Sequence, residues 1–192
     1  MIRIHIVGCA KTGTTLLQRL FWAYQGAHVI HGEITPAAAC KATPPPGVEV
    51  LVSKRSMDTA FSADLAPAVI QQQLEAFAAA GVQLVATVRA REAVLNARSG
   101  SPGARRYDAC VGQMRAYRGH LADTVSYEEL IHRPGVVQAR LAEVFNLRAA
   151  HPFTDYPEFV PPHAFVKAWG PSYSARPLGA PPPSLADDKA DP

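Results

Sequence analysis

Hydrophobic and polar residues alternate at the start of the chain and then change to a helical spacing. Residues 2–8, IRIHIVG, place apolar side chains at every second position and end in glycine, which predicts a β-strand entering a tight turn. The apolar residues that follow recur every three or four positions: Leu16, Leu17, Leu20, Phe21 and Tyr24. The opening segment is therefore expected to be a strand, a glycine-rich loop and a helix.

Predicted strands and helices alternate along the rest of the chain. Further strands are expected at residues 27–31, 48–55, 82–90 and, as a short strand and turn, 124–130. Helices are expected to end near Gly81, to start near Arg91 and break around 99–103, to run from about 104 to 120, and to begin at Pro134. This alternation predicts an α/β fold with a mostly parallel central sheet flanked by helices.

Length and composition predict one domain with a flexible tail. The chain has 192 residues, which is enough for a single core without metals or disulfides. We expect one domain over residues 1–170. Residues 171–192 are rich in proline, alanine and serine, and are expected to be flexible.

Charge and cysteine content exclude few partners but favour some. A net charge of +3 does not by itself indicate nucleic acid or membrane, although clustered cations would suit a small polyanion. The basic segment 105–120 contains aromatic residues, but a cationic helix near a ligand explains it better than a nucleic-acid interface. Three widely spaced cysteines favour a reducing, cytoplasmic location. The chain has no apolar run of 18 residues, so we expect no membrane span, and a strand at residue 2 leaves no room for a signal peptide.

The first glycine-rich loop has the composition of an anion site. Gly8 and Gly13 have the spacing of a phosphate-binding loop, but Thr14 stands where that motif has its lysine, and Lys11 lies inside the loop. Backbone amides of such a turn, followed by a helix N-terminus, bind anions. Lys11 is expected to reach over the anion. Three hydroxyls are expected to donate to its oxygens: those of Thr12, Thr14 and Thr15.

Cations, rather than carboxylates, end the predicted core strands. One strand ends in Lys54 and Arg55, and another ends in Arg89. A magnesium-nucleotide enzyme usually has an acidic residue at such a position. The pattern favours a polyanionic ligand that is neutralised by side chains, so no metal is expected.

Three segments resemble the sulfotransferase superfamily. The loop KTGTT (Lys11–Thr15) matches its 5'-phosphosulfate loop, TVRAREAV places Arg89 at a strand end, and residues 126–147 contain a YEEL stretch followed by a proline-led helix. The resemblance spans residues 2–147. It implies a P-loop three-layer fold and an enzyme that uses 3'-phosphoadenosine 5'-phosphosulfate as co-substrate. The expected acceptor is a hydroxyl or amine of a carbohydrate or small molecule.

The resemblance also implies roles for individual residues. Residues expected to bind the donor are Gly8, Lys11, Thr12, Gly13, Thr14, Thr15 and Arg89. The family usually has a serine eight residues after the arginine for the 3'-phosphate, but here that position is Ala97, and Asn96 or Ser99 is expected to substitute. Lys11 is expected to stabilise the leaving oxygen. Three residues compete for the role of base, His31, Glu33 and Lys54; we favour Glu33 as the base and Lys54 as its electrostatic partner.

Two other functions stay open from the sequence. One is an atypical P-loop kinase, which requires ATP, magnesium and an acidic strand end. The other is a non-catalytic relative that binds a nucleotide or a partner protein. The acceptor itself is not encoded in the motifs, and its contacts are expected in residues 32–47, 99–106 and 148–176.

Overall fold

The structure is a computed structural model that describes residues 1–30, 32–57, 65–96, 102–150 and 152–153. Within these residues, five strands form one parallel sheet: β1 (Ile2–Gly8), β2 (Ala27–Val29), β3 (Val50–Ser56), β4 (Val82–Val88) and β5 (Leu121–Ser126). Their order is β2-β3-β1-β4-β5, so the first strand lies at the centre. The predicted α/β fold with a parallel central sheet is confirmed.

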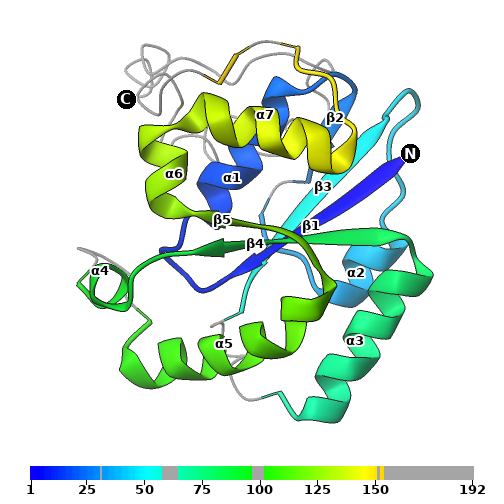
Figure 1. The fold of residues 1–192 in the computed structure, drawn as a ribbon. Helices are drawn as coiled ribbons and strands as arrows, with labels where there is room; N and C mark the ends of the chain where they lie inside the picture. Colours follow the sequence, from blue (N-terminus) through cyan, green and yellow to red (C-terminus); the bar gives the residue numbers. More distant parts are fainter. Residues whose placement is uncertain (31, 58–64, 97–101, 151, 154–192) are drawn as a thin grey trace, which may run out of the picture.

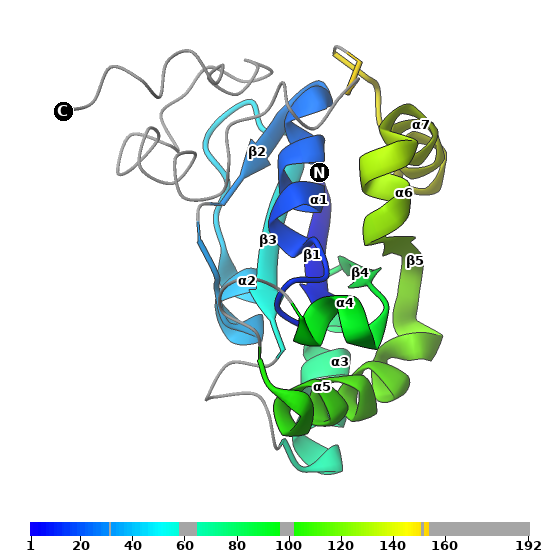
Figure 2. The same cartoon turned by 90° about the vertical axis from the view of Figure 1, so that its left-hand side faces the viewer.

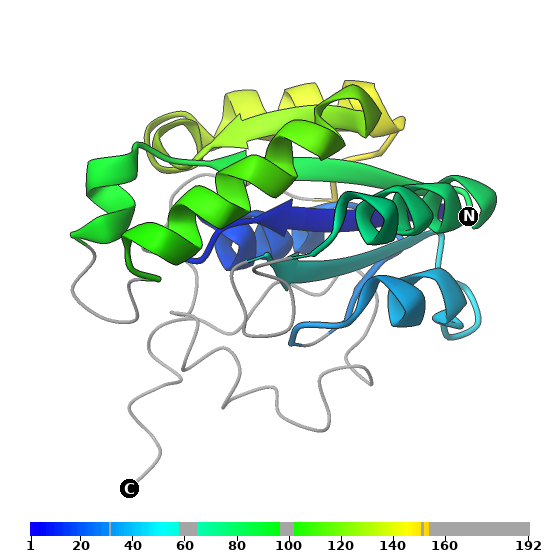
Figure 3. The same cartoon turned by 90° about the horizontal axis from the view of Figure 1, so that it is seen from below.

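Helices cover both faces of the sheet and make a three-layer arrangement (Figure 1). One face carries α1 (Thr14–Leu20), the short 3₁₀ turn η1 (Phe21–Ala23), α6 (Tyr127–His132) and α7 (Pro134–Phe145). The other face carries α2 (Pro36–Lys41), α3 (Pro67–Ala79) and α5 (Ala104–Tyr117), which lie in front of the strands in Figure 3. The connection from β4 to β5 also contains α4 (Arg91–Leu95) and η2 (Arg118–His120).

The central strand divides its side chains between two cores. Ile4 and Ile6 pack with α1, α6 and α7, whereas Val7 packs with α3 and α5. His5 also faces α3, where its ring lies 5.1 Å from that of Phe77. A parallel sheet with helices on both sides buries both faces of its strands, which explains why this short strand is almost wholly buried.

All five carboxyl ends lie at one edge of the sheet, which faces the viewer in Figure 2. The chain leaves β1 toward β3 and β2, and it leaves β4 toward β5 on the opposite side. The connections after β1 and β4 therefore diverge between two neighbouring strands. Ligands in open α/β sheets bind outside the carboxyl ends at such a point.

Two elements differ from the sequence-based expectation. The YEEL stretch is not a strand and turn but helix α6, because Ser126 and Glu129 form a reciprocal capping box at its start. Helix α2 was not predicted. It begins at Pro36 after Thr35, whose hydroxyl accepts from the Ala38 amide.

The described chain packs onto the domain as far as Phe153. The Phe153 side chain is fully buried, and its amide donates to Gln138 Oε1 at 2.8 Å. The predicted boundary between residues 170 and 171 lies outside the described residues. Among the helices of the described segments, none combines the length and apolar character that a bilayer crossing requires.

Candidate functional site

The loop between β1 and α1 is shaped by internal hydrogen bonds. The Thr12 hydroxyl donates to the Cys9 carbonyl at 2.6 Å, and it lies 2.8 Å from the hydroxyl of Thr87 on β4. Lys11 and Gly13 both have positive φ angles, 67° and 99°, which turn the chain from the strand into the helix. The buried Thr12 side chain therefore stabilises the loop, and its proton is not directed toward an external anion as the sequence had suggested.

Gly8 lies where no side chain fits. A β-carbon at this position would lie 2.8 Å from the Thr12 hydroxyl oxygen and 2.9 Å from the Thr87 carbonyl oxygen. Both distances are shorter than van der Waals contact, so the absence of a side chain is what allows the loop to rest against β4.

Arg89, directly after β4, reaches across to this loop. Its Nη1 donates to the Lys11 carbonyl at 3.3 Å, and its guanidinium carbon lies 4.0 Å from the centre of the Tyr127 ring. The Arg89 Nε also lies 3.8 Å from Glu128 Oε1. The Tyr127 ring in turn covers Gly13, where an added β-carbon would lie 3.0 Å from Tyr127 Cδ2. The structure thus brings together Lys11 and Arg89, which the sequence predicts at one anion site.

Glu33 and Lys54 form an ion pair at the carboxyl end of β3. Lys54 Nζ lies 3.2 Å from Glu33 Oε1, and the Ser56 hydroxyl donates to the same oxygen at 2.5 Å. Lys54 is buried, so this carboxylate offsets the desolvation of its ammonium group. Both contacts use Oε1, which leaves Glu33 Oε2 without a partner among the described residues and able to take a proton.

The ion pair adjoins the glycine loop through the sheet. Gly8 pairs with Ser56 in the register of β1 and β3, and the Met57 amide donates to the Gly8 carbonyl at 2.9 Å. Arg55 lies on the opposite face of β3, because side chains alternate along a strand. Lys54 and Arg55, which the sequence grouped as one basic pair, therefore lie on opposite faces of β3: Lys54 pairs with Glu33, and Arg55 lines a cavity with His5.

The remaining predicted residues have mixed placements. Lys11 is exposed, whereas Thr14 is buried and Thr15 is half-buried in the first turn of α1. Asn96 is exposed at the end of α4. The other residues considered for the base and the 3'-phosphate lie outside the described residues: His31, Ala97 and Ser99.

A cavity of about 350 Å³ lies beside the loop, between the end of β4 and helix α5. Cys9, Thr12 and Arg89 line it on the loop side, and Arg115 and Arg118 line it on the helix side. Part of the basic segment 105–120 thus borders a space next to the loop between β1 and α1. Within the described residues, no group of three or more His, Cys, Asp or Glu side chains is arranged to hold a metal ion.

The sequence did not indicate several residues that build this edge. Ser56 ends β3, Thr87 is the next-to-last residue of β4, and both bond to predicted residues, but hydroxyls near strand ends are too common to be a signal. The Tyr127 ring connects Arg89 to Gly13. The capping sequence at Ser126 and Glu129 would have placed it at a helix start, facing the same edge.

Comparison with known proteins adds no family to this description. No protein-family model matches the chain, and a search of the curated proteins finds no significant match.

Proposed function

We propose that this protein is a sulfotransferase, which moves a sulfuryl group from 3'-phosphoadenosine 5'-phosphosulfate to a hydroxyl or amine of a small acceptor. The observation that carries the proposal is that two cationic residues, Lys11 and Arg89, lie together at one glycine-rich loop. Arg89 donates to the Lys11 carbonyl and stacks on Tyr127, so both residues lie beside the start of α1. Cations at a loop and helix start favour a ligand with several negative charges.

The residues at the edge supply the groups that sulfuryl transfer needs. The sulfur–oxygen bond to the bridging oxygen of the donor breaks while a bond forms from sulfur to the oxygen or nitrogen of the acceptor. The departing adenosine 3',5'-bisphosphate keeps the electron pair, and Lys11 stabilises the charge on its leaving oxygen. Glu33 Oε2 takes the proton of the acceptor, and Lys54 fixes the carboxylate through Oε1.

The Glu33–Lys54 pair also supports the assignment of base and partner. A carboxylate held by Lys54 and Ser56 on one oxygen has a fixed orientation and one free oxygen. Positioning of this kind supplies much of the catalysis in group transfer to oxygen. The site is therefore suited to direct transfer between two bound substrates.

Isothermal titration with adenosine 3',5'-bisphosphate in the absence of magnesium tests the proposal. The wild-type protein is expected to bind it, and Lys11→Ala should weaken binding about 10–100-fold, the loss of one charge-assisted contact. Transfer of labelled sulfuryl to a panel of phenols and sugars should fall by about a hundredfold or more in the same variant. Lys41→Ala, an exposed lysine at the end of α2, is the matched control and should leave both unchanged. Full binding and turnover by Lys11→Ala would overturn the assignment.

A further inference from the structure

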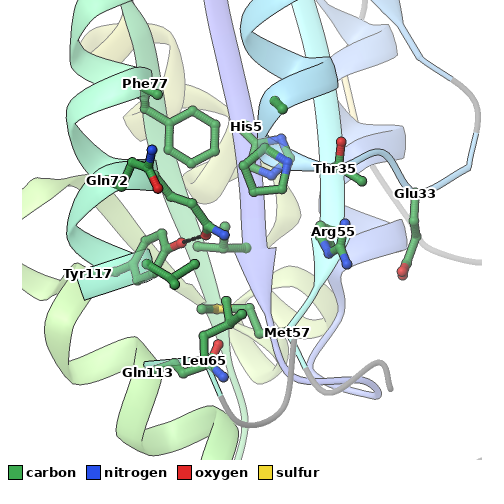
Figure 4. A pocket seen from close by; sticks show the side chains of 16 residues that line it. His5, Glu33, Thr35, Arg55, Met57, Leu65, Gln72, Phe77, Gln113 and Tyr117 are labelled. Carbon is green, nitrogen blue, oxygen red and sulfur yellow. Dashed lines mark hydrogen bonds between the residues drawn. The ribbon is translucent and has the colours of Figure 1, made fainter. Parts of the chain in front are cut away.

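A second, larger cavity opens between the sheet and helices α2, α3 and α5 (Figure 4). Its volume is about 950 Å³, at the upper end of the range for small-molecule sites. The fully buried residues His5, Phe77 and Tyr117 form its inner wall. Exposed residues such as Glu33 and Gln72 form its rim. The wall is mainly apolar, so the few polar groups on it decide what can bind.

One polar group on the inner wall lacks a partner. His5 Nδ1 lies 2.8 Å from the Ser53 hydroxyl, which itself donates to the Ile4 carbonyl at 3.4 Å. Because the single hydroxyl proton of Ser53 is directed to Ile4, we assign the ring proton to Nδ1, and this assignment leaves Nε2 as an acceptor. His5 is fully buried, and its Nε2 has no hydrogen-bond partner among the described residues. A buried acceptor without a donor costs free energy, and a ligand O–H or N–H group would remove that cost.

The histidine is neutral in this setting. Burial, together with the positive charge of Arg55, lowers the pKa of His5 to about 3. At neutral pH the ring therefore presents a lone pair and not a second proton. The Tyr117 hydroxyl is not a competing donor, because it donates to Gln73 Oε1 at 2.9 Å within the wall.

Arg55 supplies a positive charge to the same space. It lies two residues after Ser53 on β3, pairs in register with Val7 of β1, and lines the cavity together with His5 (Figure 4). Arg55 is half-buried, and it makes no ion pair with any described residue. Its guanidinium group can therefore bind a carboxylate on the ligand. Glu33 connects the rim of the cavity to the Lys54 side of the sheet edge.

We propose that this cavity binds a largely apolar organic acid that donates an O–H or N–H to His5 Nε2 and places its carboxylate against Arg55. The inference rests on the proposed function only in one respect: it identifies this molecule with the acceptor, whose reacting hydroxyl or amine is a second group at the Glu33 end and not the one held by His5. The chemistry of the cavity favours a hydrophobic acid over a carbohydrate, because its lining is mainly apolar and includes the aromatic surfaces of Phe77 and Tyr117.

Three matched biphenyls test the cavity by titration calorimetry on the full chain. 4'-Hydroxybiphenyl-4-carboxylate carries both groups, biphenyl-4-carboxylate lacks the donor, and 4-phenylphenol lacks the acid. The first compound should bind, and loss of either group should weaken binding about tenfold. His5→Phe should abolish the advantage of the hydroxyl compound over biphenyl-4-carboxylate. Arg55→Gln should weaken binding of both acids and leave 4-phenylphenol unchanged.

Two variants and a second ligand keep the outcomes separate. If His5→Phe fails to fold, Arg55→Gln at a half-buried position still tests the site. Equal affinity of the three biphenyls, or no binding of any, would overturn the cavity proposal. Binding of adenosine 3',5'-bisphosphate is measured in the same samples. If the wild-type protein binds the biphenyl acids but not the bisphosphate, the proposed function is overturned and the cavity is still a binding site for organic acids. Bisphosphate binding without biphenyl binding would overturn only the cavity proposal.

Discussion

Gly8 is the residue on which the shape of the loop between β1 and α1 depends most directly. A methyl group there would press on both the Thr12 hydroxyl and the Thr87 carbonyl, and the latter belongs to the backbone of a central strand. Overpacking of this kind costs about 1–3 kcal/mol. We expect Gly8→Ala to lower the free energy of unfolding in urea by about that amount and to weaken bisphosphate binding.

Gly135 provides the control for that substitution. It lies in α7, and an added β-carbon there meets no atom within 4 Å. Gly135→Ala should therefore leave stability unchanged or raise it by about 0.5–1 kcal/mol, the gain of alanine over glycine in a helix. Equal effects of the two substitutions would show that Gly8 is not confined by its neighbours.

Residues of the site were predictable where their signal was local. Lys11 and the two glycines follow one another within a few positions, and Lys54 lies near the end of a clear strand, so the sequence alone located them. Tyr127 is more than a hundred positions from Gly13 in the chain, and its place over that glycine follows only from the fold. The acceptor role of His5 Nε2 could not be predicted from the sequence either. It follows from the contact between Nδ1 and the Ser53 hydroxyl, and Ser53 lies on a neighbouring strand.

Strands and long helices were predictable as elements, whereas short helices were not. Central strands have apolar runs, and α3 and α7 have apolar residues at helical spacing, so hydrophobic periodicity determines them. Helices α2 and α6 have six residues each, too few for a periodic pattern. Their caps were the available signal: a threonine before a proline in one, and a serine three residues before a glutamate in the other.

Arg140 of α7 ties together the elements that carry Tyr127. Its Nη1 donates to Glu129 Oε1 of α6 at 3.0 Å, and its Nε donates to Asp123 Oδ2 of β5 at 2.9 Å. Hydrogen bonding from Arg140 lowers the pKa of Glu129 below its ordinary value of 4.5, and burial opposes the shift. Because the folded-state pKa is lowered, this contribution to stability is full above the ordinary pKa and is lost as the pH falls through the lowered one.

We expect Glu129→Gln to lower the free energy of unfolding by about 1 kcal/mol at neutral pH, since glutamine keeps the cap but loses the charge. The difference from wild type should shrink as the pH falls below 4.5, where the wild-type carboxylate becomes protonated. Urea unfolding at a series of pH values measures it. Glu143→Gln, at an exposed position on α7, is the control and should show no such trend. A difference that is constant with pH would mean that the ion pair contributes nothing.

The whole molecule places two different chemistries on one sheet. The glycine loop, Lys11 and Arg89 lie at the carboxyl edge where the chain diverges, and the large apolar cavity lies beneath the same edge on the α3 side. Glu33 is common to both, since it lines the cavity and binds Lys54. Under the two proposals, a sulfuryl donor bound at the glycine loop and an acceptor bound in the cavity would therefore meet at the Glu33 carboxylate.

This arrangement predicts how ligands change the stability of the whole chain. Adenosine 3',5'-bisphosphate at 100 times its dissociation constant should stabilise the fold by about 2.7 kcal/mol, or raise its melting temperature by about 5–10 °C. The shift should persist in a chelator if, as proposed, cations of the protein and not a divalent ion neutralise the ligand. Gly8→Ala, with its loop displaced, should show a smaller shift at the same concentration.

Stabilisation by ATP only when magnesium is present would instead favour a kinase. Stabilisation by neither nucleotide would favour a non-catalytic protein whose loop binds a different partner.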